Sequence, residues 1–414
     1  MSLNTMESSR ARAATRWLAV LGASAALAAC GGGGGGDVAQ PAGQGSLRVA
    51  ITDAPSCYEH VYVTVEKVRV HQSAAAGEAD GGWQELALSP AKRIDLVSLT
   101  NGVLEELGSM QLPAGRYSQV RLVLAENAAS GSGALANAVQ PIGGVETALS
   151  TPSAQQSGLK LQANVDVPEG AAADLVLDFD ACKSVVKAGN SGRYNLKPVV
   201  SVVPRVMAGL MGYVTTTLSL SSTTVAAQQN GTTVRSTVPD ASGKFSIPFL
   251  PAGTYTLVIT SDGRATTVLT GVPAGTTTTV VNGTATAFAP PASSMAEVTG
   301  TVTASSVSGS TTVSTAVTDA DIRALQALTG GPTIEVAHKP VDATLGTYSL
   351  RLPVAAPVKG AYATGTATLT LTPDTAVAGK YTIQAQAPGR TVQEKPVTVT
   401  SGTATTSLNF NYGP

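Results

Sequence analysis

The chain contains few of the residues from which most chemical sites are built. Of its 414 residues, three are histidine and three are cysteine, and aromatic residues account for only 4%. Charged residues account for 13%, and the formal net charge is −1. Nucleic-acid-binding proteins carry a basic excess that neutralises phosphates, and this sequence lacks one. We therefore expect no nucleic-acid partner.

Motifs for catalysis are also missing from the sequence. The histidines stand far apart and none belongs to a His-Glu-x-x-His zinc pattern; they are His60, His71 and His338. No Gly-x-Ser-x-Gly elbow occurs. Glu105 and Glu106 could suggest an acid/base pair, but adjacent residues point apart and so do not flank one scissile bond. We expect no enzyme and no cofactor.

The N-terminal segment has the order of a secretory signal. Arginines at positions 10, 12 and 16 precede a short apolar run over 17–28, which is too short for a comfortable membrane span. Small residues then lead into a cysteine. This arrangement resembles a bacterial lipoprotein signal, with Leu27-Ala28-Ala29-Cys30 as its lipobox. The alternative is an ordinary secretory signal in which Cys30 is incidental.

The lipoprotein resemblance implies an address and an anchor. It implies that residues 1–29 are removed and that the Cys30 thiol carries acyl chains, each buried CH₂ contributing roughly 0.8 kcal/mol to membrane binding. Residues 30–45 then form a flexible tether, since the glycines at 31–36 favour neither helix nor core. Gly31, and not Asp, follows the cysteine, and in this respect the sequence resembles lipoproteins that are exported to the outer membrane. We expect a cell-envelope location, with the lipid membrane as a partner.

The rest of the chain predicts an all-β fold of tandem antiparallel β-sandwich domains. In the first domain, 46–205, apolar residues alternate over 47–51, 61–65, 117–124 and 159–167, which is typical of strands with one buried face. The parity changes at Glu66-Lys67, and this change predicts a β-bulge. Shorter strands are expected at 83–86, 94–99, 175–179 and 194–203, between Gly and Pro turns.

Four ordered motifs in this first domain carry a resemblance. They are Thr52-Asp53-Ala54-Pro55, Leu112-Pro113-Ala114-Gly115-Arg116-Tyr117, the stretch from Leu177 to Val186, and Leu196-Lys197-Pro198-Val199. Together they resemble the bacterial domain-of-unknown-function family 4382. The resemblance implies an exported β domain, common on lipoproteins, and implies no activity.

Two cysteines remain in the exported part, Cys57 and Cys182. An even pair in an exported protein is most simply one disulfide, and two buried thiols are the alternative. A bond would bring Asp53 near Asp178 and Asp180, and three carboxylates could bind Ca²⁺. The other interpretation is that Asp53 caps a turn while the other two flank Phe179 on a solvated strand face. We favour it, because no calcium-loop spacing is present.

The second domain, 210–288, has the motifs of another family. Gly212-Tyr213-Val214 is followed by Asp240-x-x-Gly243-x-Phe245, then by Leu250-Pro251-Ala252-Gly253-Thr254-Tyr255 and Gly263. This order resembles the carboxypeptidase regulatory-like domain, which implies a small transthyretin-like β-sandwich. The stretch Ala378-Gly379-Lys380-Tyr381 repeats part of the pattern. We therefore expect a second, diverged unit over 295–414.

Two segments between these motifs predict something other than a strand. Residues 318–328 carry a capping residue and apolar positions at Ile322, Leu325 and Leu328, which favour a helical insert. Residues 287–294 contain Pro290-Pro291, and we expect a stiff linker that keeps the two units apart.

Two functions of different classes fit this sequence. The first is a membrane-anchored structural or protein-interaction lipoprotein, with an envelope protein as the further partner. The alternative is a carbohydrate-binding surface lipoprotein with a glycan as partner. Sugar sites usually need exposed aromatic platforms, and Trp83 and Tyr255 are the residues we would test. A basic group, Lys183, Lys187, Arg193 and Lys197, could contact an anionic polymer but favours a solvated face. The sequence leaves the oligomeric state open.

Overall fold

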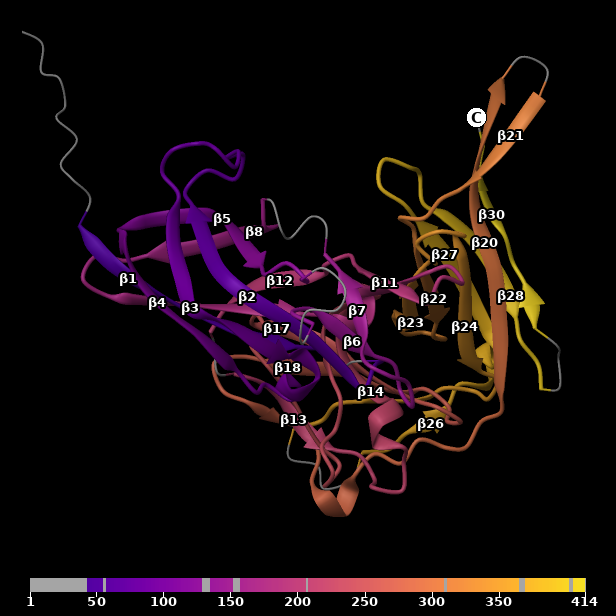
Figure 1. Cartoon of the computed structure of the whole chain (residues 1–414). Helices are drawn as coiled ribbons and strands as arrows, with labels where there is room; N and C mark the ends of the chain where they lie inside the picture. The colour runs from indigo at the N-terminus through magenta and orange to yellow at the C-terminus, as the bar shows by residue number, and fades with distance from the viewer. Residues whose placement is uncertain are drawn as a thin grey trace, which may run out of the picture. The chain divides into compact units, whose positions relative to one another are not determined.

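Strands dominate the computed structural model, which confirms the all-β prediction (Figure 1). The structure describes residues 43–54, 57–128, 135–151, 157–205, 208–308, 311–364, 369–401 and 405–413. The predicted signal peptide, most of the tether and Cys30 lie outside these residues. Residues 42–414 belong to one compact unit. No helix in the described ranges has the length and apolar character needed to cross a membrane.

The first domain packs two sheets face to face. The smaller sheet has the order β12-β9-β1-β4. Its strands are β1 (Gln44–Asp53), β4 (Glu105–Pro113), β9 (Ala172–Phe179) and β12 (Val200–Pro204). The larger sheet has the order β10-β11-β7-β6-β2-β5-β8, with β3 paired to β2. Its strands are β2 (His60–His71), β3 (Gln84–Asp95), β5 (Gly115–Leu124), β6 (Ala138–Gln140), β7 (Thr147–Ser150), β8 (Leu159–Val167), β10 (Val185–Ala188) and β11 (Arg193–Leu196).

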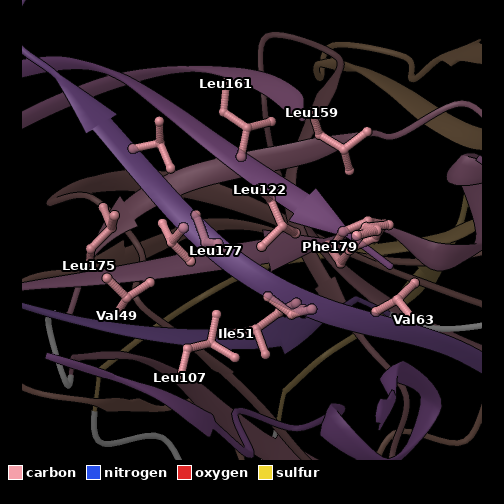
Figure 2. Packing of buried hydrophobic residues seen from close by; sticks show 14 of the residues in the cluster. Val49, Ile51, Val63, Leu107, Leu122, Leu159, Leu161, Leu175, Leu177 and Phe179 are labelled. Atoms are coloured by element: carbon pink, nitrogen blue, oxygen red, sulfur yellow. The ribbon is translucent and has the colours of Figure 1, made fainter. Parts of the chain in front are cut away.

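The core of this domain lies between the two sheets (Figure 2). Val49 and Ile51 on β1 and Leu177 on β9 face Val63 on β2 and Leu122 on β5, and all five are fully buried. These are the alternating apolar positions of the sequence. The register of β2 shifts between Val65 and Lys67 against both of its long neighbours, which confirms the predicted bulge. The bulge keeps Val68 and Val70 on the buried face.

Short helical turns connect some strands. The single described α-helix, α2 (Ala181–Ser184), follows β9, and Asp180 caps it by accepting a hydrogen bond from the Lys183 N–H. Among the residues that the structure describes there are also four 3-10 turns, namely η1 (Leu96–Leu99), η2 (Leu220–Ser222), η3 (Thr284–Thr286) and η4 (Thr375–Val377). The predicted strand at 94–99 is therefore the end of β3 followed by η1.

The second domain also pairs two sheets. One has the order β16-β13-β19, built from β13 (Gly209–Tyr213), β16 (Lys244–Pro248) and β19 (Thr279–Val280). The other begins β15-β14-β17-β18, built from β14 (Thr223–Gln229), β15 (Thr232–Thr237), β17 (Gly253–Ser261) and β18 (Thr267–Ala274). Most strand pairs in the chain are antiparallel, and a few, including β1 with β9 and β13 with β19, are parallel.

Two strands from the C-terminal part of the chain extend the second sheet of this domain. They are β25 (Val358–Ala361) and β26 (Thr372–Pro373), and β25 pairs parallel with β18. Val358 is buried and its N–H donates to the Thr266 carbonyl at 2.9 Å. Thus a segment inside the predicted range 295–414 completes a sheet of the second domain.

The remaining strands form two more sheets. One contains β20 (Met295–Ser308), β21 (Thr311–Ala316), β24 (Thr347–Pro353), β29 (Thr406–Ser407) and β30 (Phe410–Tyr412), with β20 at its centre. The other has the order β23-β22-β27-β28, built from β22 (Asp321–Ala327), β23 (Thr333–Pro340), β27 (Lys380–Gln386) and β28 (Gln393–Thr398). Their shared core includes Val298, Ile322, Leu350, Ile383 and Phe410.

The predicted helix over 318–328 is wrong, because this segment contains strand β22. Ile322, Ala324 and Gln326 are buried while the residues between and beside them are half-buried or exposed, a period of two. β22 pairs on both sides, with β23 and β27. A helix this short is marginal by itself. Two ladders of backbone hydrogen bonds and a buried face outweigh its local capping signal.

The predicted spacer over 287–294 is also wrong, because this segment packs onto the second domain. The Phe288 N–H donates to the Tyr213 carbonyl at 2.9 Å, and the Ala265 N–H donates to the Pro291 carbonyl at 2.8 Å. The Phe288 ring is buried with the core of that domain. The backbone N–H and C=O groups of residues 287–294 need hydrogen-bond partners, and the second domain supplies them at Phe288 and Pro291.

Candidate functional site

The structure joins the predicted cysteine pair. Cys57 and Cys182 form a disulfide with their Cα atoms 5.1 Å apart, which confirms the predicted pairing. The bond ties the segment before β2 to helix α2. It therefore fixes the position of Asp180 and Lys183, the two charged residues at the ends of that short helix.

The three predicted carboxylates are engaged by three different groups. The Asp53 carboxylate accepts from the Ala181 N–H at 3.0 Å, Asp178 pairs with Arg235 at 2.8 Å, and Asp180 pairs with Lys183 at 2.8 Å. Asp178 is buried, so its predicted place on a solvated face is wrong. Across the described ranges, no group of three or more His, Cys, Asp or Glu side chains could hold a metal ion.

Burial sets the protonation of the two inner carboxylates. It raises the pKa of Asp53 well above its usual value, although the Ala181 N–H opposes this. It also raises the pKa of Asp178 to about 6, against the lowering effect of Arg235. The same burial lowers the pKa of Arg235. Asp178 lies on β9 and Arg235 on β15, so this ion pair joins the first and second domains.

The histidines have structural partners. His60 and His71 stand at the two ends of β2; the Nδ1 atom of His60 lies 2.6 Å from Asp95, and the Nε2 atom of His71 lies 3.0 Å from the Gly81 carbonyl. His338 lies on β23, with its ring nitrogens 3.7 Å from Glu335 and from Asp321.

The basic group does not form one exposed surface. Lys183 is paired with Asp180, and Lys197 donates to the Thr318 carbonyl. Lys187 and Arg193 are exposed on β10 and β11. Only these two are free to contact a polymer, so the structure does not favour a polyanion site here.

Glu335 on β23 is the centre of a buried polar junction that sequence reasoning missed. Its carboxylate is 2.5 Å from Arg323 Nε and accepts from the Thr233 hydroxyl at 2.9 Å. Burial raises the pKa of Glu335, but His338, Lys183 and Arg323 lower it more, to about 2. The pKa of His338 is raised, because contacts with Asp321 and Glu335 outweigh its burial.

The backbone of Glu335 is covered by a side chain of the second domain. The Gln228 side-chain amide donates to the Glu335 carbonyl at 2.7 Å and accepts from the Glu335 N–H at 2.9 Å. β23 is an edge strand of its sheet, and an edge exposes unpaired backbone groups. The amide of Gln228 supplies one donor and one acceptor, as a neighbouring strand would. No local pattern in the sequence links residues 107 positions apart.

A cavity of about 390 Å³ opens beside this junction. Helix α2 and the disulfide line one side, the outward-facing side chains of β14 and β17 line a second, and β23 lines a third. The polar groups that it presents include Lys183, Thr224, Thr260, Glu335 and His338. No described Phe, Tyr or Trp side chain lines it. It has room for a small polar molecule but offers no platform for a sugar ring.

The two aromatic residues proposed for glycan binding lie elsewhere and are engaged. Tyr255 is buried in the core of the second domain, and its hydroxyl donates to the Pro251 carbonyl at 2.7 Å. The guanidinium groups of Arg69 and Arg121 lie 4.7 and 4.8 Å from the centre of the Trp83 ring. These cation–π contacts occupy ring surface that a sugar would need.

Two family models match this chain, in the order that the motifs predicted. Residues 44–198 match the family described as Domain of unknown function (DUF4382), and residues 209–286 match the Carboxypeptidase regulatory-like domain. These matches confirm both resemblances, and neither description names a reaction. The diverged second unit over 295–414 stays a prediction. No curated protein matches the chain.

Two solved structures show a distant likeness to this chain. The TIE protein of Bacillus anthracis is 13% identical with a TM-score of 0.17, over 90% of this chain and 50% of that chain. The pilus adhesin SpaC from Lactobacillus rhamnosus GG is 9% identical with a TM-score of 0.13, over 90% of this chain and 44% of that chain. This chain thus spans about half the length of either protein. At such TM-scores neither likeness carries an argument about function.

Proposed function

We propose that this chain is a lipid-anchored protein of the bacterial cell envelope, on the outer membrane, with a structural or protein-interaction role and no catalysis. The N-terminal order of basic residues, apolar run and Leu27-Ala28-Ala29-Cys30 supports the anchor. Two matched β domains whose descriptions name no reaction support the passive role.

The buried junction around Glu335 is the main support for a structural role. Side chains from β14, β15 and β22 all reach this one residue on β23, and the Asp178–Arg235 pair joins β9 to β15 nearby. Buried charges are costly unless they are paired and hydrogen-bonded, so these contacts oppose separation of the domains. A protein that must hold β domains in fixed relation needs such contacts, and a flexible string of domains does not.

A labelling experiment tests the anchor. Cells expressing the full chain are grown with a traceable palmitate, beside cells expressing Cys30→Ser. We expect label and membrane fractionation for the natural chain, and loss of both for the variant, because the acyl chains supply the membrane affinity. A natural chain that stays unlabelled and soluble would contradict the proposal.

Carbohydrate binding has no comparable support. Trp83 lies under two guanidinium groups, Tyr255 is buried, and the cavity beside Glu335 is lined by no described Phe, Tyr or Trp. A glycan array with the exported chain still provides a direct check, and reproducible hits lost in Trp83→Ala would favour that alternative.

A further inference from the structure

A long hairpin extends from the sheet centred on β20. The first half of β20 pairs with β24, and its second half, from Thr303 to Ser308, pairs with β21 (Figure 1). All six residues of β21 are exposed. Val307 and Val313 stand on the two strands with 61% and 44% of their surface accessible. At its base, Thr303 and Ala304 also pair with β30, and Ala304 packs against the core. No described residue of β20 beyond Ala304, and no residue of β21, belongs to a core.

The hairpin has no charge. No Asp, Glu, Lys or Arg occurs between Glu297 and Asp319. Soluble proteins usually protect an edge strand with charge, proline or a cover, since its free N–H and C=O groups can pair with another strand. Other edges of this chain follow that rule: β28 carries Glu394, Lys395 and Pro396, and β23 is covered by Gln228. β21 has none of these protections.

The backbone of β21 is also incompletely paired. It lies at the end of its sheet and pairs only with β20 among the described residues. A two-stranded ribbon without a hydrophobic face is marginally stable in water. Its residues are nonetheless good strand formers, chiefly Thr and Val. Such a segment gains stability when a further strand pairs with it.

We propose that the outer edge of β21 pairs antiparallel with β21 of a second copy of this chain. Two identical edges can meet across a two-fold axis, with each making the same contacts. Because the edge is neutral, the identical strands do not repel each other. Charge on a partner would find no counter-charge on this edge, so a neutral Thr- and Val-rich strand suits it best, and β21 is such a strand.

This inference rests on the proposed anchor in one respect. Six paired residues bury too little surface for a strong dimer in dilute solution. Copies held on one membrane by Cys30 would meet at a high effective concentration, so a weak edge contact could suffice there.

Cysteine cross-linking tests the pairing. Single cysteines replace Thr311, Thr312, Ser314 or Thr315 in the full chain, and the variants are oxidised mildly, alone and in pairwise mixtures, in membranes and as concentrated purified protein. Opposed residues of antiparallel strands have Cα separations that allow a disulfide. We expect a disulfide-linked dimer in at least one case, and its loss when Val313→Lys is added. Thr398→Cys on the protected edge strand β28 is the matched control and should stay monomeric.

Two other results of the cross-linking experiment would overturn different parts of the proposal. Monomers in every combination, in both membranes and concentrated solution, would overturn the pairing. A mixed disulfide with a different protein would overturn the second copy as partner. Palmitate labelling of the same cells reports separately on the anchor. A labelled chain without dimers refutes only this inference, and an unlabelled chain that still dimerises in solution refutes only the anchor.

Discussion

The ion pair between Asp178 and Arg235 is the most buried one in the described chain, with side-chain exposures of 9% and 7%. Replacing Arg235 with Met leaves the Asp178 carboxylate without its counter-charge. We expect a loss of about 3 kcal/mol in the free energy of unfolding, measured by urea titration. The matched control is Arg48→Ala, which breaks the exposed Arg48–Asp174 pair. Its loss should be below about 1 kcal/mol. Equal losses in the two variants would contradict the role of burial.

The pH dependence of stability follows from single side chains. Burial raises the pKa of Asp178 to about 6, so the folded state holds a proton that the unfolded state releases near its ordinary pKa of 3.8. Stability from this group is lost as pH rises from its unfolded to its folded pKa. The pKa of His338 is also raised above 6.5, so its contribution is lost at still higher pH. The pKa of Glu335 is lowered from 4.5 to about 2, so its contribution to stability is lost only when the pH falls below about 4.5.

We therefore expect the urea midpoint to fall as the pH rises from about 5 to about 8. Asp178→Asn removes one of the two buried carboxyls with a raised pKa, so the part of the curve below about pH 6 should become less steep, while Asp53 keeps part of the slope. A midpoint that rises over the same range would show that the buried carboxyl and His338 do not govern this window.

At the scale of elements, the covered edge of β23 gives a sharp test because the chain provides its own control. Gln228→Ala leaves the N–H and C=O groups of Glu335 without partners. We expect a loss of about 2 kcal/mol, measured by urea titration. Gln229→Ala removes the neighbouring amide, which donates to the Thr254 carbonyl at an exposed site. That change should stay within about 0.5 kcal/mol. Similar effects of the two substitutions would argue against strand covering by Gln228.

A strand could be predicted from the sequence where the alternation of apolar and polar residues runs unbroken along it. β1, β2, β5 and β8 follow from alternating apolar residues, and even the bulge at Lys67 left a visible change of parity. β4 was missed because its buried residues, Leu107, Met110 and Leu112, change parity at Gly108. The φ of this glycine is +136°, and the register with β1 shifts beside it. A glycine can adopt this backbone and so interrupts the pattern that would identify a strand.

The junction could not be predicted for a different reason. Glu335, Arg323 and Gln228 look like ordinary surface residues of amphipathic strands. Their burial arises only when separate parts of the chain meet, and no local pattern encodes that contact. The disulfide was predictable because Cys57 and Cys182 are the two cysteines of the sequence outside the predicted lipobox, and one even pair leaves few possibilities. The helix expected at 318–328 failed because tertiary strand pairing overrode a local signal.

At the scale of the whole molecule, the disulfide should contribute much of the stability of the first domain. It links residues 125 positions apart and so restricts the unfolded chain strongly. In the chain-entropy view, replacing Cys57 and Cys182 with Ser costs roughly 4–5 kcal/mol. Urea titration with and without reductant measures this. Reductant should lower the midpoint of the natural chain to that of the double variant, and an unchanged midpoint would contradict the estimate.

We expect the buried junction around Glu335 to make the stability of each domain depend on the others. Hydrogen–deuterium exchange of the natural chain and of Glu335→Ala, followed on β5, β17 and β27, tests it most directly, since these strands lie in three different sheets. We predict that the substitution lowers protection in all three strands. Loss of protection confined to β27, with β5 and β17 unchanged, would contradict the claim and leave the domains independent.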